Sequence, residues 1–207
     1  MGYFPFFVEL SEKQGLIVGG GTVALRKVQK LLPYGPRLAV AAPELHGELR
    51  TICGLELRER PFVPEDLEGC DFVIAATDDH ALNHRIAALC RERGILVNVA
   101  DCKEDCTFLF PALVKRGDLS VGISTSGAGP TAAIYFKERI ADLLPERLEE
   151  ILAYLEAARE TVKDQIPEES RRRQLLRELF DECMRAGGPL PGTALPEKLQ
   201  AAQEVHG

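Results

Sequence analysis

Several features that would each define a class of protein are missing from this chain. No apolar run reaches about 18 residues, so the sequence predicts no membrane span. Acidic residues outnumber basic ones: the chain has 32 Asp and Glu but 25 Lys and Arg, so its net charge is -7. Since nucleic-acid binders need a basic surface to neutralise phosphates, this balance argues against a nucleic-acid partner.

The cysteines lack the spacing of a structural metal site. No two of them form a CxxC pair, and Cys102 and Cys106 have neither a second pair nor a histidine close by in the sequence. The N-terminal stretch MGYFPFFVEL has no basic leader and no small-residue cleavage site, so we expect it to be part of the fold. We therefore predict free thiols, no metal site and a cytoplasmic location. The six cysteines are Cys53, Cys70, Cys90, Cys102, Cys106 and Cys183.

The most informative stretch that is present is GLIVGGGTVALRK, at residues 15–27. An apolar run ends in three glycines and passes directly into a helical pattern, and residues 19, 21 and 24 match G-x-G-x-x-A. In a dinucleotide-binding turn Gly19 permits the tight turn, Gly21 lets the backbone approach the phosphates, and Ala24 lets the helix pack on the strand. We expect the pyrophosphate at the positive end of that helix. The alternative is a glycine-rich turn that binds nothing.

Up to about residue 110, short apolar runs alternate with helical patterns. The runs lack clean alternation, which is typical of parallel strands buried on both faces. With a phosphate loop after the first strand, this order predicts a Rossmann-type doubly wound α/β fold. The expected strands lie at 16–18, 38–42, 55–60 (an edge strand), 72–76 and 95–99, and the expected helices at 22–32 and 79–93.

The pattern changes after this region and predicts two further parts. Two strands, 109–114 and 119–123, flank an expected turn at 115–118, and a helix is expected from Pro130 through Leu143. Charge-rich helical patterns follow, and the breakers from Gly187 onward indicate a loop or loose tail. The expected domains are 1–110 (dinucleotide-binding), 111–145 (a small dimerisation region) and 146–207 (helical).

Polar residues follow several of the expected strands, at the edge where open parallel sheets bind ligands. Glu44 follows the second strand and could reach an adenosine ribose, and no arginine stands directly at that strand's end, so NAD is favoured over NADP. Thr77 could contact the cofactor, or Thr77 or Asp78 could cap the next helix. Asp101 could transfer a proton, although a single aspartate at a strand end is more often a turn residue.

Basic side chains are also available for a ligand that carries carboxylates. Because the net charge is negative, such a ligand must be met by a local basic cluster rather than by the overall field. For any one of these residues a solvated surface position is the commoner role. The candidates are Arg26, Lys27, Lys115, Arg116, Lys137 and Arg139.

Several motifs together resemble the precorrin-2 dehydrogenase module of siroheme synthases. They are GLIVGGGTVALRKVQKLL, VIAATDD with Asn83 shortly after it, NVAD, FLFPALVKRGDLSVGISTSGAGP and ERIADLLPERL. The order NVAD, then FP, a strand and an S-[ST]-x-G-x-x-P turn is more specific than the glycine loop. The resemblance runs from about Phe4 to at least Leu155, and no trace of the methyltransferase domain of some members is visible.

This resemblance implies a fold and a reaction. The fold would be a Rossmann domain, a central dimerisation region and a helical C-terminal domain, assembled as an interlocked homodimer. The reaction would be NAD-dependent oxidation of precorrin-2 to sirohydrochlorin, and some members also insert Fe2+ to give sirohaem. The essential aspartate of the NVxD motif corresponds to Asp101, which would receive or steer the proton while the substrate is held against the nicotinamide.

The resemblance also places binding residues. Dinucleotide contacts fall on the residues after the glycines and after the second expected strand, and the tetrapyrrole lies near the S-[ST]-x-G turn, where this chain has Thr125 between two serines. With the residues derived above, the expected cofactor set is Gly19, Gly20, Gly21, Thr22, Val23, Pro43, Glu44, Thr77 and Asn98. The expected substrate set is Ser124, Thr125, Ser126, Lys115 and Arg116.

Three alternatives stay open. The first is a dehydrogenase without chelatase activity. The second is a non-catalytic NAD-binding regulatory module, similar to ligand-gating domains of transporters, and the segment FLFPALVKRGDLSVGISTSGAGP counts against it. The third is a Rossmann domain that acts on another small metabolite.

Overall fold

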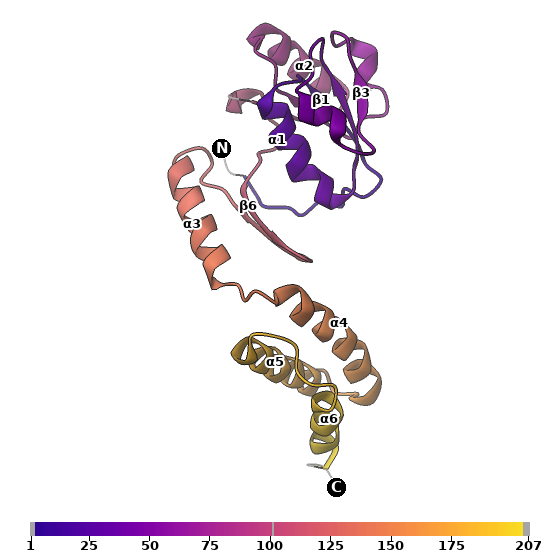
Figure 1. Ribbon diagram of the computed structural model, residues 1–207, viewed down its shortest axis with the longest axis vertical. Coiled ribbons are helices and arrows are strands. Elements are labelled where there is room, and N and C mark those ends of the chain that lie inside the picture. Colours follow the sequence, from indigo (N-terminus) through magenta and orange to yellow (C-terminus); the bar gives the residue numbers. More distant parts are fainter. Residues whose placement is uncertain (1–2, 101, 205–207) are drawn as a thin grey trace. The chain divides into compact units, whose positions relative to one another are not determined.

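The computed structural model describes residues 3–100 and 102–204, and it divides into two compact units, Met1–Phe110 and Pro111–Gly207 (Figure 1). Asp101, which the sequence predicts to be catalytic, lies outside the described residues. Among those residues no helix has the length and apolar character needed to cross a bilayer.

A five-stranded parallel sheet forms the centre of the first unit, in the order β3-β2-β1-β4-β5. The strand β1 pairs with β2 on one side and β4 on the other, so the strand order reverses at β1. This confirms the doubly wound α/β fold, and it opens the crevice in which such sheets bind ligands. The strands are β1 (Gln14–Val18), β2 (Arg37–Ala41), β3 (Glu56–Arg58), β4 (Phe72–Ala75) and β5 (Leu96–Val99).

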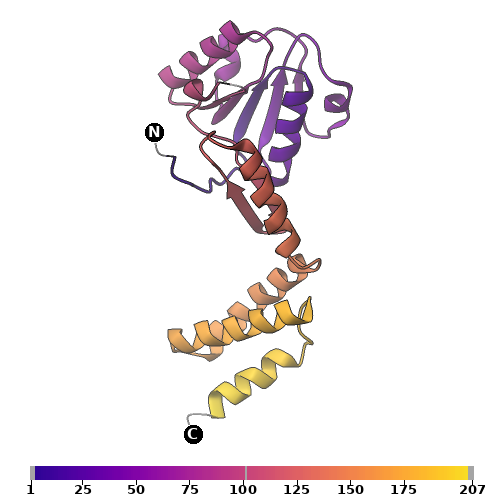
Figure 2. The same ribbon diagram turned by 90° about the vertical axis from the view of Figure 1, so that its left-hand side faces the viewer.

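Two helices cover opposite faces of the sheet (Figure 2). Ile17 of β1 belongs to the same buried cluster as the apolar residues of α1 (Thr22–Leu31). Leu16 and Val18 belong to the cluster formed with the apolar residues of α2 (His80–Glu92). Apolar residues on both faces explain why the strand sequences do not alternate. Short 3-10 helices complete the unit: η1 (Leu32–Tyr34), η2 (Gly47–Thr51), η3 (Pro64–Leu67) and η4 (Lys103–Asp105).

The N-terminal cap of α2 differs from the sequence prediction. Asp79 is the cap, and its side chain accepts a hydrogen bond from the Leu82 amide at 3.0 Å. The expectation that Thr77 or Asp78 fills this place is therefore wrong. The Thr77 hydroxyl donates instead to Asn83 Oδ1 at 2.7 Å, which ties the end of β4 to the second turn of α2.

The second unit begins with an antiparallel hairpin of β6 (Ala112–Arg116) and β7 (Leu119–Ile123). Lys115 and Arg116 belong to β6, so the expected four-residue turn is wrong and the connection is only Gly117-Asp118. Gly117 has φ +52°, a conformation that suits glycine. The helix α3 (Pro130–Leu143) packs against both strands and has the predicted bounds.

Three more helices follow: α4 (Leu148–Gln165), α5 (Glu169–Ala186) and α6 (Ala194–Glu204). They share one apolar core, in which Val162, Leu179 and Leu199 are buried. The expected loose tail is therefore wrong, because α6 packs on the helices before it through Leu199. The structure joins 111–145 and 146–207 in one unit, and their separation into two domains stays a prediction.

Candidate functional site

The turn between β1 and α1 can be built only with glycines at its first two positions. Gly19 has φ +121°, and a Cβ there would lie 2.3 Å from the Ala76 carbonyl oxygen. A Cβ on Gly20 would lie 1.9 Å from the Glu44 carbonyl oxygen. Both distances are far below van der Waals contact. The turn therefore packs closely between the segment that follows β4 and the segment that follows β2.

The third glycine, Gly21, has open space beside it. A Cβ on Gly21 would meet no described atom within 4 Å, so this position opens outward. Gly21 is the N-cap of α1, no side chain caps the helix there, and the first turn carries no acidic residue. Thr22 and Val23 are exposed beside it. The first amides of α1 are thus available to an anion, and the residues present fit a dinucleotide phosphate.

The chain that leaves β2 lies directly against this turn. Pro43 and Glu44 are exposed, and the amide of His46 donates to the Gly20 carbonyl at 2.7 Å. The structure therefore brings the expected residues after β1 and β2 together. A contact between Glu44 and a ribose stays a prediction.

Two arginines that the sequence analysis did not single out lie on the β3 side of this edge. Arg58 ends β3 and pairs in register with Ala41 of β2, and Arg60 follows two residues later. Both guanidinium groups bind Asp66, at 2.9 Å and 2.6 Å. The hydrogen bond from Arg60, followed by those from the Val63 amide and Arg58, lowers the pKa of the buried Asp66 to about 2.

At the end of β4, Thr77 is held by the protein itself. Its hydroxyl and its amide both face Asn83 Oδ1, while Asn83 Nδ2 donates to the Thr77 carbonyl at 2.9 Å. Asn83 is buried, so this closed pair fixes the backbone where β4 turns toward α2. Thr77 is half-buried at the predicted edge, and its contact with a cofactor stays a prediction.

Asn98 on β5 is buried and also fully engaged. Its Nδ2 donates to the Phe108 carbonyl at 3.0 Å, and its Oδ1 accepts from Lys27 Nζ of α1 at 3.2 Å. The Lys27 ammonium also lies 3.8 Å from the centre of the Phe110 ring. Asn98 thus joins β5, α1 and the segment after β5, and its expected role in cofactor binding stays a prediction.

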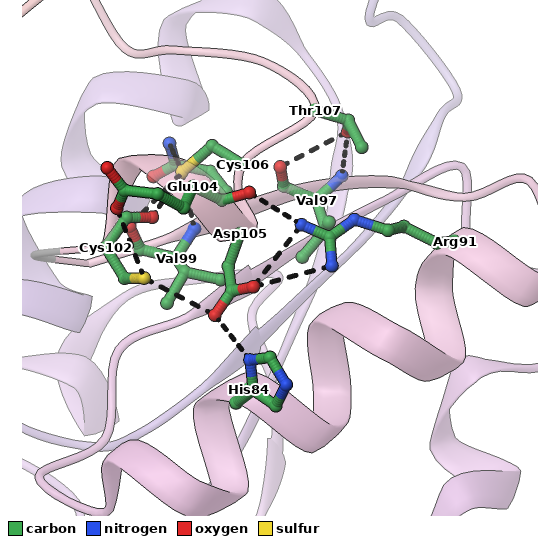
Figure 3. A network of polar contacts seen from close by, with 10 residues as sticks. His84, Arg91, Val97, Val99, Cys102, Glu104, Asp105, Cys106 and Thr107 are labelled. Carbon is green, nitrogen blue, oxygen red and sulfur yellow. Dashed lines mark hydrogen bonds and ion pairs between the residues drawn. The ribbon is translucent and has the colours of Figure 1, made fainter.

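A network that sequence reasoning missed lies beside the end of β5 (Figure 3). Asp105, in η4, contacts His84 and Arg91 of α2 and the thiol of Cys102. The hydrogen bond from His84 and then that from Cys102 lower the pKa of Asp105 despite its burial. No local pattern pairs residues 84 and 105, which are 21 positions apart, and the four histidines look scattered in the sequence.

The expected substrate residues lie in the second unit. Thr125 Oγ1 accepts from the Gly129 amide and Ser124 Oγ accepts from the Ser126 amide, each at 3.1 Å, so these three residues form one turn before α3. Arg116 pairs with Leu119 at the closed end of the hairpin, whereas Ser124 follows the opposite end of β7. Lys115 and Arg116 therefore do not join the serine turn, and a role for either group stays a prediction.

Comparison with known proteins gives a family and two close relatives. A family model described as putative NAD(P)-binding covers residues 6–112. The siroheme synthase of Pseudomonas paraeruginosa (strain DSM 24068 / PA7) is 36% identical over 100% of this chain and 46% of its own length. That of Photorhabdus laumondii subsp. laumondii is 41% identical over 87% of this chain and 39% of its own length.

A solved structure, described as SirC, precorrin-2 dehydrogenase, also matches. It superposes on this chain with a TM-score of 0.75 at 28% identity. The match covers 98% of this chain and 100% of the other. The chain thus spans less than half of the curated siroheme synthases quoted above and the whole length of this solved chain.

Proposed function

We propose an activity from one premise: the chain belongs to the putative NAD(P)-binding family, among the relatives of siroheme synthases and precorrin-2 dehydrogenase. This membership confirms the resemblance that the sequence motifs indicated. The proposed activity is NAD-dependent oxidation of precorrin-2 to sirohydrochlorin. Because the chain covers less than half of the siroheme synthases quoted, their activities are carried over only as part of this proposal.

The observation that carries the proposal is the glycine turn. Gly19 and Gly20 are sterically obligatory, and Gly21 leaves an open approach to the uncapped amides of α1. A turn that binds nothing would not need an uncapped helix end beside two forced glycines. Glu44 lies against this turn, where a carboxylate favours a free ribose hydroxyl over a 2′-phosphate, and hence NAD.

The chain's own residues divide the chemistry as follows. The amides of Thr22 and Val23 would hold the pyrophosphate, and Glu44 would orient the adenosine ribose. Bound NAD supplies the acceptor for the hydride that leaves precorrin-2. Asp101, in the NVAD motif, would accept the proton that leaves the substrate, a step in which a placed carboxylate contributes about 10²–10⁴-fold. The serine turn at 124–126 would contact the tetrapyrrole.

An anaerobic assay with precorrin-2 and NAD tests this activity by the formation of NADH. We expect turnover by the wild-type chain and a loss of about 10²-fold or more in kcat for Asp101→Asn. NADP in place of NAD should raise KM. A folded Asp101→Asn variant with wild-type kcat would remove Asp101 from the reaction, and a wild-type chain that forms no NADH would reject the activity.

A second step, Fe2+ insertion into sirohydrochlorin, is proposed because the relatives quoted include siroheme synthases. In this step Fe2+ is a substrate, and Asp101 could take the pyrrole protons that chelation releases. Adding Fe2+ anaerobically once NADH formation is complete, and following the tetrapyrrole spectrum, decides between a bifunctional enzyme and a dehydrogenase alone.

Homodimer formation is proposed from the exposed apolar side chains of α3. Tyr135, Phe136 and Leu143 lie on one side of this helix; the first two are about half exposed, and Leu143 is 77% exposed. Monomeric proteins rarely leave large apolar side chains grouped in this way uncovered. Light scattering should give twice the chain mass, and Phe136→Ser with Leu143→Ser should give a monomer.

We also propose a cytoplasmic location, since the six cysteines are free thiols.

A further inference from the structure

A buried carboxylate with three different partners lies just after the proposed catalytic position. The side chain of Asp105 is only 10% exposed. Its Oδ2 lies 2.9 Å from His84 Nδ1 and 3.4 Å from Cys102 Sγ, and its Oδ1 lies 3.3 Å from an Arg91 nitrogen (Figure 3). Because an ionised carboxylate only accepts hydrogen bonds, the His84 Nδ1 must carry the proton.

Both basic partners come from one side of α2. His84 and Arg91 are seven residues apart, or about two helical turns, so they project from the same side. Arg91 also donates to the Glu104 carbonyl at 2.9 Å. A helix packed on the sheet therefore holds η4 through two side chains at once. We call these contacts of His84, Arg91 and Cys102 with Asp105 the α2 clasp.

The same segment is fastened to β5 at its far end. The Val99 amide donates to Cys106 Sγ at 3.2 Å. The Thr107 hydroxyl accepts from the Val97 amide at 2.7 Å, and the Thr107 amide donates to the Val97 carbonyl at 2.8 Å. The chain thus leaves β5 at its carboxyl end and returns along its outer edge.

Position 101 stands in the sequence between two anchored neighbours. The Ala100 amide donates to the Ala75 carbonyl of β4 at 2.8 Å, which secures the N-terminal side. Cys102 on the C-terminal side is secured by its contact with Asp105. The return along β5 also reaches this segment, because Cys106 Sγ donates to the Cys102 carbonyl at 3.2 Å and the Cys106 amide donates to the Lys103 carbonyl at 3.1 Å. The α2 clasp adds a second restraint on residues 102–105, which comes from the helix.

Stability alone is a weak reason for such a clasp. Burying a carboxylate carries a desolvation cost that apolar packing of similar size avoids. A metal site is no better explanation, because no group of three or more ligating side chains among residues 3–100 and 102–204 is arranged to hold an ion. The remaining role is geometric, since proton transfer requires the carboxylate to be placed to within about 1 Å.

We propose that Asp105 is a positioning residue for the dehydrogenase step, acting through Asp101 by restraining the chain that follows it. This inference rests on the proposed function. His84 and Arg91 act with Asp105 as parts of the same restraint, and none of the three needs to touch substrate or cofactor.

The test compares two buried carboxylates of the first unit. Asp105→Asn and His84→Gln weaken the α2 clasp, while Asp66→Asn removes a carboxylate of similar burial that binds two arginines elsewhere. In the anaerobic NADH assay we expect kcat to fall about tenfold or more for Asp105→Asn and less for His84→Gln. The KM for NAD should stay within twofold. Asp66→Asn should lower the melting temperature and leave kcat within twofold.

A double variant separates positioning from a direct role. If Asp105 acts through Asp101, Asp105→Asn should have no further effect on the residual kcat of Asp101→Asn, because the two losses are not additive. Unchanged kcat in folded Asp105→Asn, an equal loss in Asp66→Asn, or additive losses in the double variant would each overturn the inference. A wild-type chain without NADH formation rejects the proposed function itself and the positioning role with it.

Discussion

At the scale of single residues, the three glycines after β1 have two different tasks. The first two are required by close backbone contacts, and the third lies in open space at the start of α1. The spacing G-x-G-x-x-A counts Gly19 and Gly21 but not Gly20, which has the shortest contact of the three. The motif alone therefore does not show which glycine the fold needs most.

A pair of alanine substitutions should separate these tasks. Gly20→Ala places a methyl group 1.9 Å from a backbone oxygen, so we expect a lower melting temperature and loss of NAD binding. Gly21→Ala should cost about 1 kcal/mol or less in stability, because it changes only the cap residue. It should still weaken NAD binding more than tenfold, since the methyl group stands where phosphates must approach. Calorimetry on both variants checks this, and tight NAD binding by Gly21→Ala would contradict the site.

Asp66 makes a second prediction at this scale, for acid stability. Its pKa falls from 3.8 to about 2 on folding, so it adds stability above pH 4 that is lost as the pH falls toward 2. This change in pKa contributes about 2 kcal/mol to the free energy of unfolding at neutral pH. Denaturant unfolding between pH 5 and 2 should show a shallower pH dependence for Asp66→Asn than for wild type. Equal slopes for the two proteins would mean that Asp66 is not ionised in this arrangement.

At the scale of elements, sequence patterns predicted what local chemistry determines. The strands of the sheet were found because apolar side chains on both faces leave a continuous apolar run, and α3 was found from the proline at its first position. The helix α6 was missed because breakers precede it. Pro196 lies in its first turn, where the missing amide costs nothing, and Leu199 provides the buried contact.

The helix α6 offers a direct test of that correction. Leu199→Ala should lower the free energy of unfolding of the second unit by about 2–5 kcal/mol, because it removes a buried side chain that joins α6 to the core. Glu197→Ala on the exposed side of α6 is the control and should change stability by less than about 0.5 kcal/mol. Urea unfolding followed by circular dichroism measures the free energy of unfolding of both variants. Similar losses of stability for the two variants would mean that α6 does not pack on the core.

Tertiary contacts account for the parts of the site that the sequence did not predict. Residues at strand ends could be placed because parallel strands share an edge. The α2 clasp could not, because His84 and Asp105 meet only once α2 has packed on the sheet. The same holds for Arg58 and Arg60, whose charges look free in the sequence and are bound to Asp66 in the fold.

At the scale of the whole molecule, the cofactor and substrate predictions fall on different units. The expected dinucleotide residues lie in Met1–Phe110 and the expected tetrapyrrole residues in Pro111–Gly207. Each unit has its own buried core, so each has its own source of stability.

Separate cores predict separate responses to a ligand. A ligand that binds one folded unit raises the stability of that unit by about 2.7 kcal/mol when its concentration is 100 times Kd. We therefore expect calorimetry to show two unfolding transitions, one for each unit. NAD should raise the melting temperature of only one of them, and it should be the transition whose melting temperature Asp66→Asn lowers. A single transition that shifts as a whole would show that the units unfold together.

The return of the chain along β5 also limits how copies of this protein can associate. Residues 106–108 occupy hydrogen-bonding groups on one margin of the parallel sheet, and the opposite margin, β3, is three residues long and carries Glu56 and Arg58. Strand addition by a neighbouring molecule is disfavoured at both margins. Edge-to-edge pairing of two sheets is therefore not a route by which copies of the first unit would join, and the dimer contact proposed for α3 uses neither margin of this sheet.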